Sequence, residues 1–440
     1  MITVIGDTSS NTRIDAHISA PINAPDDVPT QIDQQELFLQ KRRFIIKLGK
    51  ALHKYGTPAY RLEAHLQSVS TFLKLQSNFM VTPTSLTFVI SEVDEDHQEY
   101  SHIVRVKPGE LDLGSLARID ELVDEVASEQ RTLSEALERL DDIANKTLPY
   151  GQLLAFLSYG GASGAFAMLM QTNWNSVIWS SLIGFAVFSF QFWSEKSQRI
   201  AGVLEPLVAL ISALLASAIA VYDPTLNVPL VILSSIIVYI PGLALTLGLS
   251  ELSARHLMSG TARIMDAIMS LFKLYFGAVL GVSIAGLMWT NTVFVPSTNT
   301  PLWTSWLAVT TLGLSLIVLF KMRIKDAPWG MLSGFISYSA TLLGSLFLGA
   351  ALGGFIGAFA LGIYSNVYSR VQHLPSTIVM LLGLVMLVPG SKIYIGLNTA
   401  VSGQSILNST DIGAQSFLIL MSLVAGLIFA DVVLPPQELL

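Results

Sequence analysis

The sequence has no cysteine and few charged residues for its length. Of the 440 residues, 13% are charged and 52% are hydrophobic. The absence of cysteine excludes a disulfide framework, thiolate metal ligands and a cysteine nucleophile. The scarcity of charge, together with apolar residues concentrated in the last two thirds of the chain, predicts an integral membrane protein that lies in a lipid bilayer and has no nucleic acid as partner.

Sequence signals of several enzyme classes are missing as well. The chain has no glycine-rich loop that ends in Lys-Ser or Lys-Thr, so nothing supports direct coupling to ATP, and an ion gradient, of protons, remains as the energy source by elimination. The first 148 residues contain neither a GxSxG elbow nor an HExxH helix, which are common signatures of hydrolases. We therefore predict that the protein is not an enzyme and has no catalytic residues, metal site or cofactor.

The amino-terminal third has the composition of a water-soluble part. It contains 23 of the 32 acidic residues and 15 of the 25 basic residues, counted up to Pro149. Residues 1–35 are polar and contain Pro21, Pro25 and Pro29 among aspartates. This composition predicts a short disordered tail and not a signal peptide.

Residues 36–148 show the patterns of an α+β domain. The stretch RLEAHLQSVSTFL has apolar residues at helical spacing on one face. The stretch LTFVISEVDEDHQEYSHIVRV predicts two strands around a charged turn, because β-branched and aromatic residues crowd both arms. Two amphipathic helices follow near 113–129 and 132–146. His97 and His102 beside the turn raise the alternative of a metal site, but their spacing matches no familiar ligand set and favours a solvated hairpin tip.

Ten apolar runs follow, each near the roughly 20 residues that cross a bilayer. They lie near 150–171, 175–193, 203–222, 226–249, 266–290, 303–320, 328–346, 348–367, 376–397 and 414–434. The pattern predicts a polytopic α-helical membrane protein with ten transmembrane helices, preceded by a cytosolic α+β domain.

Lysine and arginine are unevenly distributed among the loops between these runs. The loops after even-numbered runs contain Lys196, Arg199, Arg255, Arg263, Lys321, Arg323, Lys325 and Arg370. The other loops contain only Lys392. Because cytosolic loops are rich in lysine and arginine, this bias predicts that the even-numbered loops, the amino terminus and the carboxyl terminus lie in the cytosol.

A Pro-Gly pair interrupts one apolar run, and the interruption recurs. The stretch VYIPGLALTLGL contains Pro241 and Gly242, and MLVPGSKIYIGL contains Pro389 and Gly390 in the same register. The pairs fall late in the fourth and ninth runs, so the membrane part divides into two repeats of five spans. An odd number of spans forces the repeats into opposite orientations, which is the inverted-repeat plan of many secondary transporters. The two repeats are residues 149–300 and 301–440.

Each Pro-Gly pair predicts an unwound segment that contributes to substrate binding. Proline removes a backbone donor and clashes with the preceding turn, while glycine permits an irregular backbone. In lipid, the freed carbonyls are tolerated only where protein or a water-filled cavity can satisfy them. The alternative is a simple kink in a packed helix, which the matching register of the two pairs disfavours.

The fifth run carries ionisable residues on one helix face. Arg263, Asp266, Ser270 and Lys273 follow one another at three- and four-residue steps. Such groups normally face a cavity or one another, and an amino acid substrate needs a cation for its carboxylate and an anion for its ammonium group. The alternative is an Arg263–Asp266 pair at the cytosolic interface with Lys273 snorkelling. Glu205, at the start of the third run, is a candidate proton-linked carboxylate, with an interfacial residue as the alternative.

Several stretches resemble landmarks of the threonine/serine exporter family, to which the fungal pheromone-regulated membrane proteins are related. They are LGKALHKYGTPAYRLEAHL, TPTSLTFVIS, IPGLALTLGLSEL, SGTARI and LVPG, in the family's order within residues 44–430. The resemblance implies export of threonine and serine from the cytosol by proton-coupled antiport, in a bacterial inner membrane. The family's Arg-x-Glu carries over to Arg61 and Glu63, which are candidates for coupling or gating, with an exposed salt bridge as the alternative. Lys392 is a further candidate that has no counterpart in the first repeat.

Other functions stay open from the sequence. One alternative within transport is export of small carboxylates such as dicarboxylates, for which Arg263, Lys273 and Lys392 could supply cations. The alternative outside transport is a membrane-anchored hydrolase, against which the number of apolar runs argues, since an anchor needs far fewer. The sequence also leaves open a homo-oligomer, and whether the soluble domain gates, senses or docks.

Overall fold

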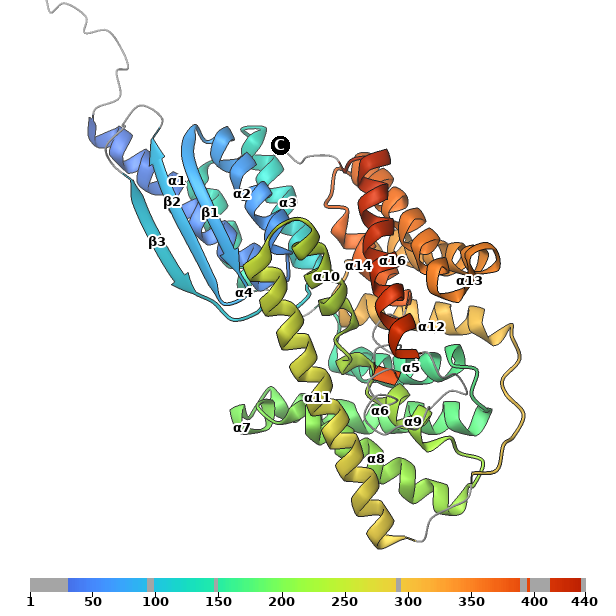
Figure 1. Ribbon diagram of the computed structural model, residues 1–440. Helices are drawn as coiled ribbons and strands as arrows, with labels where there is room; N and C mark the ends of the chain where they lie inside the picture. Colours follow the sequence, from blue (N-terminus) through green and yellow to red (C-terminus); the bar gives the residue numbers. More distant parts are fainter. Residues whose placement is uncertain are drawn as a thin grey trace, which may run out of the picture. The chain divides into compact units, whose positions relative to one another are not determined.

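The computed structural model describes most of the chain. The described residues are 31–92, 99–145, 149–289, 294–387, 394–395 and 412–436. Residues 1–39 and 40–440 form two compact units, and the first is described only where helix α1 (Gln31–Lys54) begins. That helix starts at Gln31, inside the segment 1–35 that was predicted to be a disordered tail. The contacts described below lie within the second unit. Figure 1 shows the helices and strands, coloured along the sequence.

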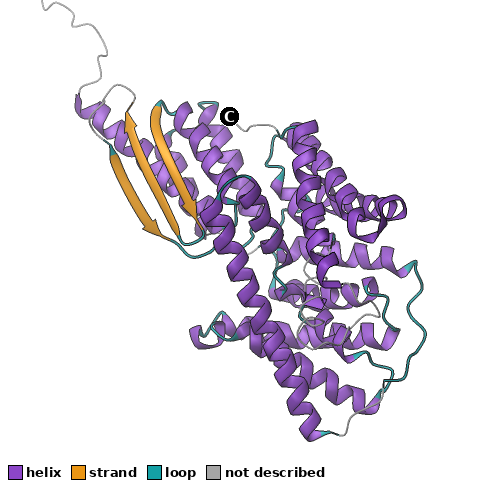
Figure 2. Cartoon of the chain, viewed as in Figure 1, coloured by secondary structure: helices purple, strands orange, loops and turns teal. Residues whose placement is uncertain are grey.

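The amino-terminal part of the second unit combines helices with a small sheet (Figure 2). Its elements are the end of α1, α2 (Ala59–Phe72), β1 (Leu75–Thr82), β2 (Ser85–Glu92), β3 (Tyr100–Arg105), α3 (Leu113–Ala127) and α4 (Leu133–Asn145). The strands are antiparallel in the order β1-β2-β3, and Phe79, Phe88 and His102 lie opposite one another across them. The predicted hairpin, β2–β3, is confirmed. Strand β1 was not predicted.

One hydrophobic core joins the helices and the sheet of this part. Leu62 and Leu66 of α2 are fully buried, as their spacing predicts, and so is Phe88 of β2. Gly49 of α1 lies against the Phe88 ring, where an added Cβ would come within 2.8 Å of it. His97 lies outside the described residues, and among those that are described no group of His, Asp or Glu could hold a metal ion.

The remaining helices are apolar, as expected for a polytopic membrane protein. They are α5 (Gln152–Leu169), α6 (Trp174–Ser194), α7 (Gln198–Ala201), α8 (Leu204–Tyr222), α9 (Val228–Ser235), η1 (Ile237–Tyr239), α10 (Gly242–Ser253), α11 (Leu257–Met288), α12 (Thr304–Leu319), α13 (Ala327–Gln372), α14 (Thr377–Met386) and α16 (Ile412–Val433). In the described chain, 6 helices are long and apolar enough to cross a membrane, or up to 7 when the bent pair around η1 counts as one span. The total of ten spans and their inverted repeat stay predictions.

Helix α13 consists of two antiparallel helices. Its backbone breaks at Gly349, whose φ of 80° lies in the left-handed region that glycine adopts without strain. Beyond the break, Gly353 packs against Ser345, and a Cβ added to Gly353 would lie 2.7 Å from the Ser345 backbone nitrogen. A one-residue turn therefore links two helices that correspond to the predicted spans 328–346 and 348–367.

Candidate functional site

The predicted interruption at Pro241 is a break between two helices. Helix α9 ends at Ser235, the short helix η1 ends at Tyr239, and α10 begins at Gly242. A bend of 57° separates Val228–Ser235 from Ile237–Ser253, five residues before Pro241. Pro241 has φ −80° and ψ 41°, and the Gly242 N–H donates to the Ile240 carbonyl at 2.8 Å. These values are close to an inverse γ-turn centred on Pro241. The apolar run is thus unwound where the sequence predicts.

Unwinding frees backbone groups on both sides of the turn. Pro241 has no N–H, so the Val238 carbonyl loses the donor that a continuing 3₁₀ turn would supply. On the other side, the first N–H groups of α10 have no acceptor within their own helix. The amino-terminal end of a helix also carries partial positive charge, which favours an anion such as a carboxylate.

A cavity of about 560 Å³ lies at this break. Its walls come from α5, α6, α12, the segment Ile237–Ala244 and, on another side, from Gly56 and the loop that holds Gly109. Four charged residues line it, namely Glu110, Glu195, Arg263 and Lys321. The cavity is thus bounded by both the membrane helices and the amino-terminal part.

Polar aromatic residues line the cavity beside the break. The Tyr239 hydroxyl donates to the Gln191 side-chain oxygen at 3.0 Å. The rings of Tyr159 and Tyr239 lie 6.2 Å apart, and all three residues line the cavity. Hydroxyl and amide groups can donate and accept hydrogen bonds, so they can bind a small polar molecule without a fixed charge.

Glu251, near the end of α10, organises the region next to the cavity. Its side chain is fully buried. Its carboxylate accepts from Arg263 Nη2 at 3.0 Å and Nε at 3.2 Å, from the Ser259 hydroxyl at 2.9 Å and from the Ala59 backbone N–H at 3.0 Å. Arg263 therefore pairs with Glu251 and not with Asp266, which is exposed. The predicted alternative of an Arg263–Asp266 pair is wrong.

The Arg-x-Glu residues of α2 make separate contacts. Arg61 donates to the Ser376 hydroxyl at 2.8 Å, next to the start of α14. Glu63 accepts from the Val81 backbone N–H at 2.7 Å and pairs with His256, at 3.4 Å, next to the start of α11. The alternative of an exposed salt bridge is wrong, because both side chains attach α2 to other elements. These contacts and the Ala59–Glu251 bond are called the α2 contact below.

Three other predicted residues come together on α8 and α11. Glu205 lies in the first turn of α8 and accepts from the Ser270 hydroxyl and from Lys273 Nζ, each at 2.9 Å. The Lys273 side chain is 42% exposed, and these three residues do not line the cavity at the break. The position of Glu205 at a helix end agrees with the interfacial alternative.

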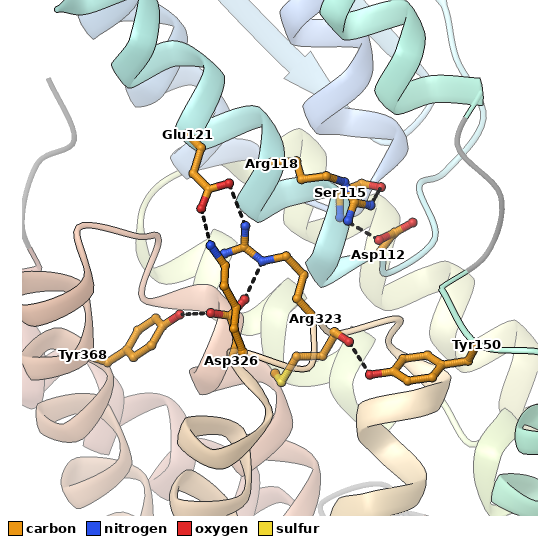
Figure 3. A network of polar contacts seen from close by, with 10 residues as sticks. Asp112, Ser115, Arg118, Glu121, Tyr150, Arg323, Asp326 and Tyr368 are labelled. Carbon is orange, nitrogen blue, oxygen red and sulfur yellow. Dashed lines mark hydrogen bonds and ion pairs between the residues drawn. The ribbon is translucent and has the colours of Figure 1, made fainter.

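A second contact joins α3 to the loop between α12 and α13 (Figure 3). Arg323 lies between Glu121, at 2.8 Å, and Asp326, at 2.6 Å. Lys325 also pairs with Glu121 at 2.6 Å, and the Tyr368 hydroxyl donates to Asp326 at 3.4 Å. Burial raises the pKa of Glu121, but the bonds from Lys325 and Arg323 outweigh this and lower the pKa overall. We call this cluster the α3 contact.

Asp120 lies beside the α3 contact without a full set of partners. Its side chain is 3% exposed, and one carboxylate oxygen has no hydrogen-bond partner. Burial, together with the nearby Asp124 and Glu121 carboxylates, raises the pKa of Asp120 well above its usual range. One nitrogen of the Arg323 guanidinium is also buried without a partner. Sequence reasoning missed Asp120 and Glu251, and placed Arg323 only as a loop cation.

The other half of the predicted paired site cannot be compared with the first. Pro389, Gly390 and Lys392 lie outside the described residues. The cavity at Pro241 is therefore described from one break alone. Of the predicted substrate-binding residues, Pro241, Gly242 and Arg263 line this cavity, whereas Asp266, Ser270 and Lys273 do not.

Comparison with known proteins identifies the family. Residues 43–285 match the model described as "Putative threonine/serine exporter", and residues 304–433 match the one described as "Threonine/Serine exporter, ThrE". An uncharacterized protein of Schizosaccharomyces pombe is 25% identical over 90% of this chain and 54% of its own length. Pheromone-regulated membrane protein 10 is 26% identical in Yarrowia lipolytica, over 80% of this chain and 30% of the relative, and 26% identical in Saccharomyces cerevisiae, over 80% and 46%.

The chain spans about half, or less, of the length of these fungal relatives. No solved structure matches the chain. The first family model alone covers more than half of the chain, from within α1 to the last turns of α11. The protein therefore belongs to the threonine/serine exporter family of membrane transporters.

Proposed function

We propose that this protein is a secondary transporter that exports small amino acids, threonine and serine, from the cytosol, driven by the proton gradient. The observation that carries the proposal is the unwound segment at Pro241 and Gly242, which opens onto a cavity of about 560 Å³. Broken helices that present backbone groups to a cavity are the binding-site architecture of many secondary transporters. A cavity of a few hundred Å³ suits a small molecule.

The charges around the cavity suit an amino acid. The amino-terminal end of α10 and the Arg263 guanidinium can attract a carboxylate. Glu110 and Glu195 offer carboxylates for the ammonium group, and Tyr239 and Gln191 can exchange hydrogen bonds with a side-chain hydroxyl. In this proposal the cavity binds the zwitterion through fixed charges and the hydroxyl through neutral groups.

We propose roles outside this cavity for the other residues predicted from the sequence. Glu205 accepts bonds from Ser270 and Lys273, and we propose that this cluster fixes α8 against α11 and takes part in proton coupling. We also keep the proposals that Pro389 and Gly390 form a second break, and that the repeats 149–300 and 301–440 are inverted. Glu205 supports proton coupling because it is a carboxylate at the end of an apolar helix that lies against a hydroxyl and an ammonium group.

The proposed orientation places both chain ends in the cytosol. The lysine and arginine bias of the loops supports it, because Arg323 and Lys325 lie in the loop that contacts α3. The acidic amino-terminal part would then lie on the cytosolic side, where the exported amino acid enters. The membrane is proposed to be a bacterial inner membrane, on the basis of the family resemblance of the sequence.

A second candidate is export of small carboxylates such as dicarboxylates. The observation that favours it is a pair of cations, Arg263 and Lys321, that both line the cavity. Each already has an acidic partner, Glu251 at 3.0 Å and Glu110 at 4.0 Å. Since Glu110 and Glu195 also line the cavity, its two cations and two carboxylates balance, which suits a zwitterion better than a doubly charged anion.

Efflux from proteoliposomes tests the two candidates together. Vesicles are loaded with labelled threonine, serine or succinate, a pH gradient is imposed, and efflux is measured. We expect threonine and serine to leave the vesicles faster than succinate. When a protonophore is added, the rate of their efflux should no longer depend on the imposed pH gradient. Efflux of succinate with no movement of either amino acid would overturn the leading proposal in favour of the second.

A variant at the break ties the activity to the cavity. Replacing Pro241 and Gly242 together with alanine restores helix-forming residues, which favours a continuous helix by roughly 3 kcal/mol for proline and about 1 kcal/mol for glycine. We expect normal insertion into membranes but greatly reduced efflux for each inserted molecule. The matched control is Pro229→Ala, in the first turn of α9, which should transport normally. Normal turnover of the double variant would mean that the break is only a kink.

A further inference from the structure

One wall of the cavity at the break comes from the amino-terminal part. Gly56 and the stretch Gly109–Leu111 line it, as does the segment Ile237–Ala244 around the break. Gly56 lies in the turn between α1 and α2, and Gly109–Leu111 lie in the loop between β3 and α3. We call these four residues the cap. A part of the chain outside the apolar helices thus closes one side of the candidate binding cavity.

The cap is a rigid piece of the amino-terminal part. The Glu110 N–H donates to the Lys54 carbonyl at 3.1 Å, which ties the loop to the end of α1. Gly109 is pressed against the His53 carbonyl, where any Cβ would come within 2.0 Å of the oxygen. Gly56 has φ 88°, which only glycine adopts readily. The cap therefore cannot move as an independent loop, and any movement of it involves α1 and α3 as well.

By contrast, few bonds connect the cap and the residues that follow it to the end of α12, where Phe320 and Lys321 also line the cavity. Glu110 pairs with Lys321 at 4.0 Å, and the Glu110 side chain is 90% exposed. Just after the cap, the Leu113 N–H donates to the Phe320 carbonyl at 3.0 Å. An exposed ion pair at this distance contributes little and exchanges readily with water. Opening this edge of the cap therefore breaks one backbone hydrogen bond and one exposed ion pair.

The α2 contact and the α3 contact, which flank the cap, also differ in how much of their charged side chains is exposed to water. At one side, the Ala59 N–H at the start of α2 is bound to the fully buried Glu251, which also holds Arg263. At the other side, Glu121 of α3 is 41% exposed and pairs with two cations of the α12–α13 loop. Water can reach Glu121 and Lys325, whereas Glu251 is fully buried and the Arg323 side chain is only 11% exposed.

We propose that the cap is the gate of the cavity on the side of the amino-terminal part, and that it opens about the Ala59–Glu251 bond. Opening separates Glu110 from Lys321 and loosens Glu121 from the α12–α13 loop, while Glu251 keeps α2 attached to α10. Because Glu251 lies on the same helix as the break, movement of the gate is transmitted to the unwound segment. This inference rests on the proposed transport function and assigns a role to the amino-terminal part.

The absence of native cysteine makes a direct test available. The full chain with Glu110→Cys and Lys321→Cys is placed in proteoliposomes and treated with a membrane-permeant dithiosulfonate cross-linker. Because a gate that cannot open blocks turnover, we expect efflux to fall by about tenfold or more. Reduction of the cross-link should restore it. The matched control is Lys47→Cys with Asp141→Cys, an ion pair within the amino-terminal part, whose cross-linking should leave efflux unchanged.

A second measurement on the same variant separates failure of the gate from failure of the proposed function. Spin labels on the two cysteines are measured by pulsed electron paramagnetic resonance, which needs no transported substrate. An opening gate gives two distance populations, one short and one long. A single short population, or undiminished efflux after cross-linking, overturns the gate. Two populations in the variant, together with an original chain that moves neither threonine, serine nor succinate, would support the gate and contradict the proposed substrate.

Discussion

The α2 contact and the α3 contact join the amino-terminal part to the apolar helices in different ways. At the α2 contact, the central group is one buried carboxylate, Glu251, that receives hydrogen bonds from a guanidinium, a hydroxyl and a backbone N–H. At the α3 contact, the central group is the Arg323 guanidinium, which lies between two carboxylates. The first set of partners is complete, whereas the second leaves an Arg323 nitrogen and an Asp120 oxygen unpaired.

This difference separates a fixed joint from an adjustable one. A buried charge that loses its partner is strongly destabilised, because nothing in the interior replaces the lost bonds. At the α3 contact, Arg323 and Asp326 are nearly buried but lie in one loop, so that pair can stay together while the partly exposed Glu121 exchanges a cation for water at lower cost. The α2 contact is therefore suited to hold position during a conformational change, and the α3 contact is suited to open and close.

The largest effect is expected from breaking the α2 contact. Glu251→Ala leaves the Arg263 guanidinium and the Ala59 N–H without an acceptor, and loss of one partner of a buried ion pair costs about 3–5 kcal/mol. We expect a lower unfolding temperature and lower yield of the full chain purified in detergent. The matched variant at the α3 contact, Glu121→Ala, should cost much less because that side chain is 41% exposed. Equal losses for the two variants would contradict the comparison.

A smaller effect is expected at the edge of the α2 contact. Arg61→Ala removes the hydrogen bond to the Ser376 hydroxyl, and a bond with a charged donor contributes about 1.5–3 kcal/mol. Ser376→Ala should lose a similar amount, and the double variant should lose little more than either single variant. If Arg61→Ala leaves both unfolding temperature and efflux unchanged, this bond has no role in stability or transport.

Asp120→Asn sharpens the comparison through pH. The folded state raises the pKa of Asp120 above the value near 4 of an unfolded chain, so the folded state binds the proton more tightly. The contribution of Asp120 to the free energy of unfolding should therefore be largest in acid and be lost as pH rises through the raised pKa. Asparagine cannot ionise, so the variant should lack this fall and gain most over the original chain at pH above the raised value.

Thermal unfolding measured in mildly acidic and mildly alkaline buffer checks this prediction. The control is Asp142→Asn, whose side chain is 72% exposed and should change neither the stability nor its pH dependence. An identical pH dependence for Asp120→Asn and the original chain would show that the Asp120 carboxyl does not titrate differently after folding.

The smallest effect is expected at the exposed rim of the α3 contact. Lys325→Met removes one of two cations from Glu121, while Arg323 stays in place. The Lys325 side chain is 59% exposed, and exposed pairs contribute less than about 1 kcal/mol. We expect an unfolding temperature within error of the original, and a loss comparable to that of Glu251→Ala would show that the α3 contact is not adjustable.

Local patterns in the sequence predicted much of the fold. The helix around Leu62 and Leu66, the β2–β3 hairpin and the unwound turn at Pro241 depend on spacing and on proline geometry, which act within a few residues. Strand β1 was missed because its segment, LQSNFMVT, mixes apolar residues with Gln, Ser and Asn and follows the helix directly. Its place in the sheet comes from pairing with β2, which is a tertiary effect.

The candidate site was less predictable, because its partners are far apart in the chain. Arg263 was placed with Asp266 by helical spacing, but its partner is Glu251 on the preceding helix. One signal was available, since Glu251 is the only acidic residue between Pro224 and Arg263. That it also receives the Ala59 N–H could not be seen, because nothing local to either residue specifies the contact.

The bond between Ala59 and Glu251 has a consequence for biosynthesis. The two residues are 192 positions apart, and at typical rates of synthesis the ribosome needs roughly 10–40 s to cover that distance. During that interval the backbone N–H at the start of α2 lacks its native acceptor, Glu251, while the apolar helices from α5 to α10 are being made and inserted. The amino-terminal part is thus translated first, but its contacts are complete only after α10 has been made. A fragment that ends before α10 lacks Glu251, the side chain that accepts the hydrogen bond from the first residue of α2.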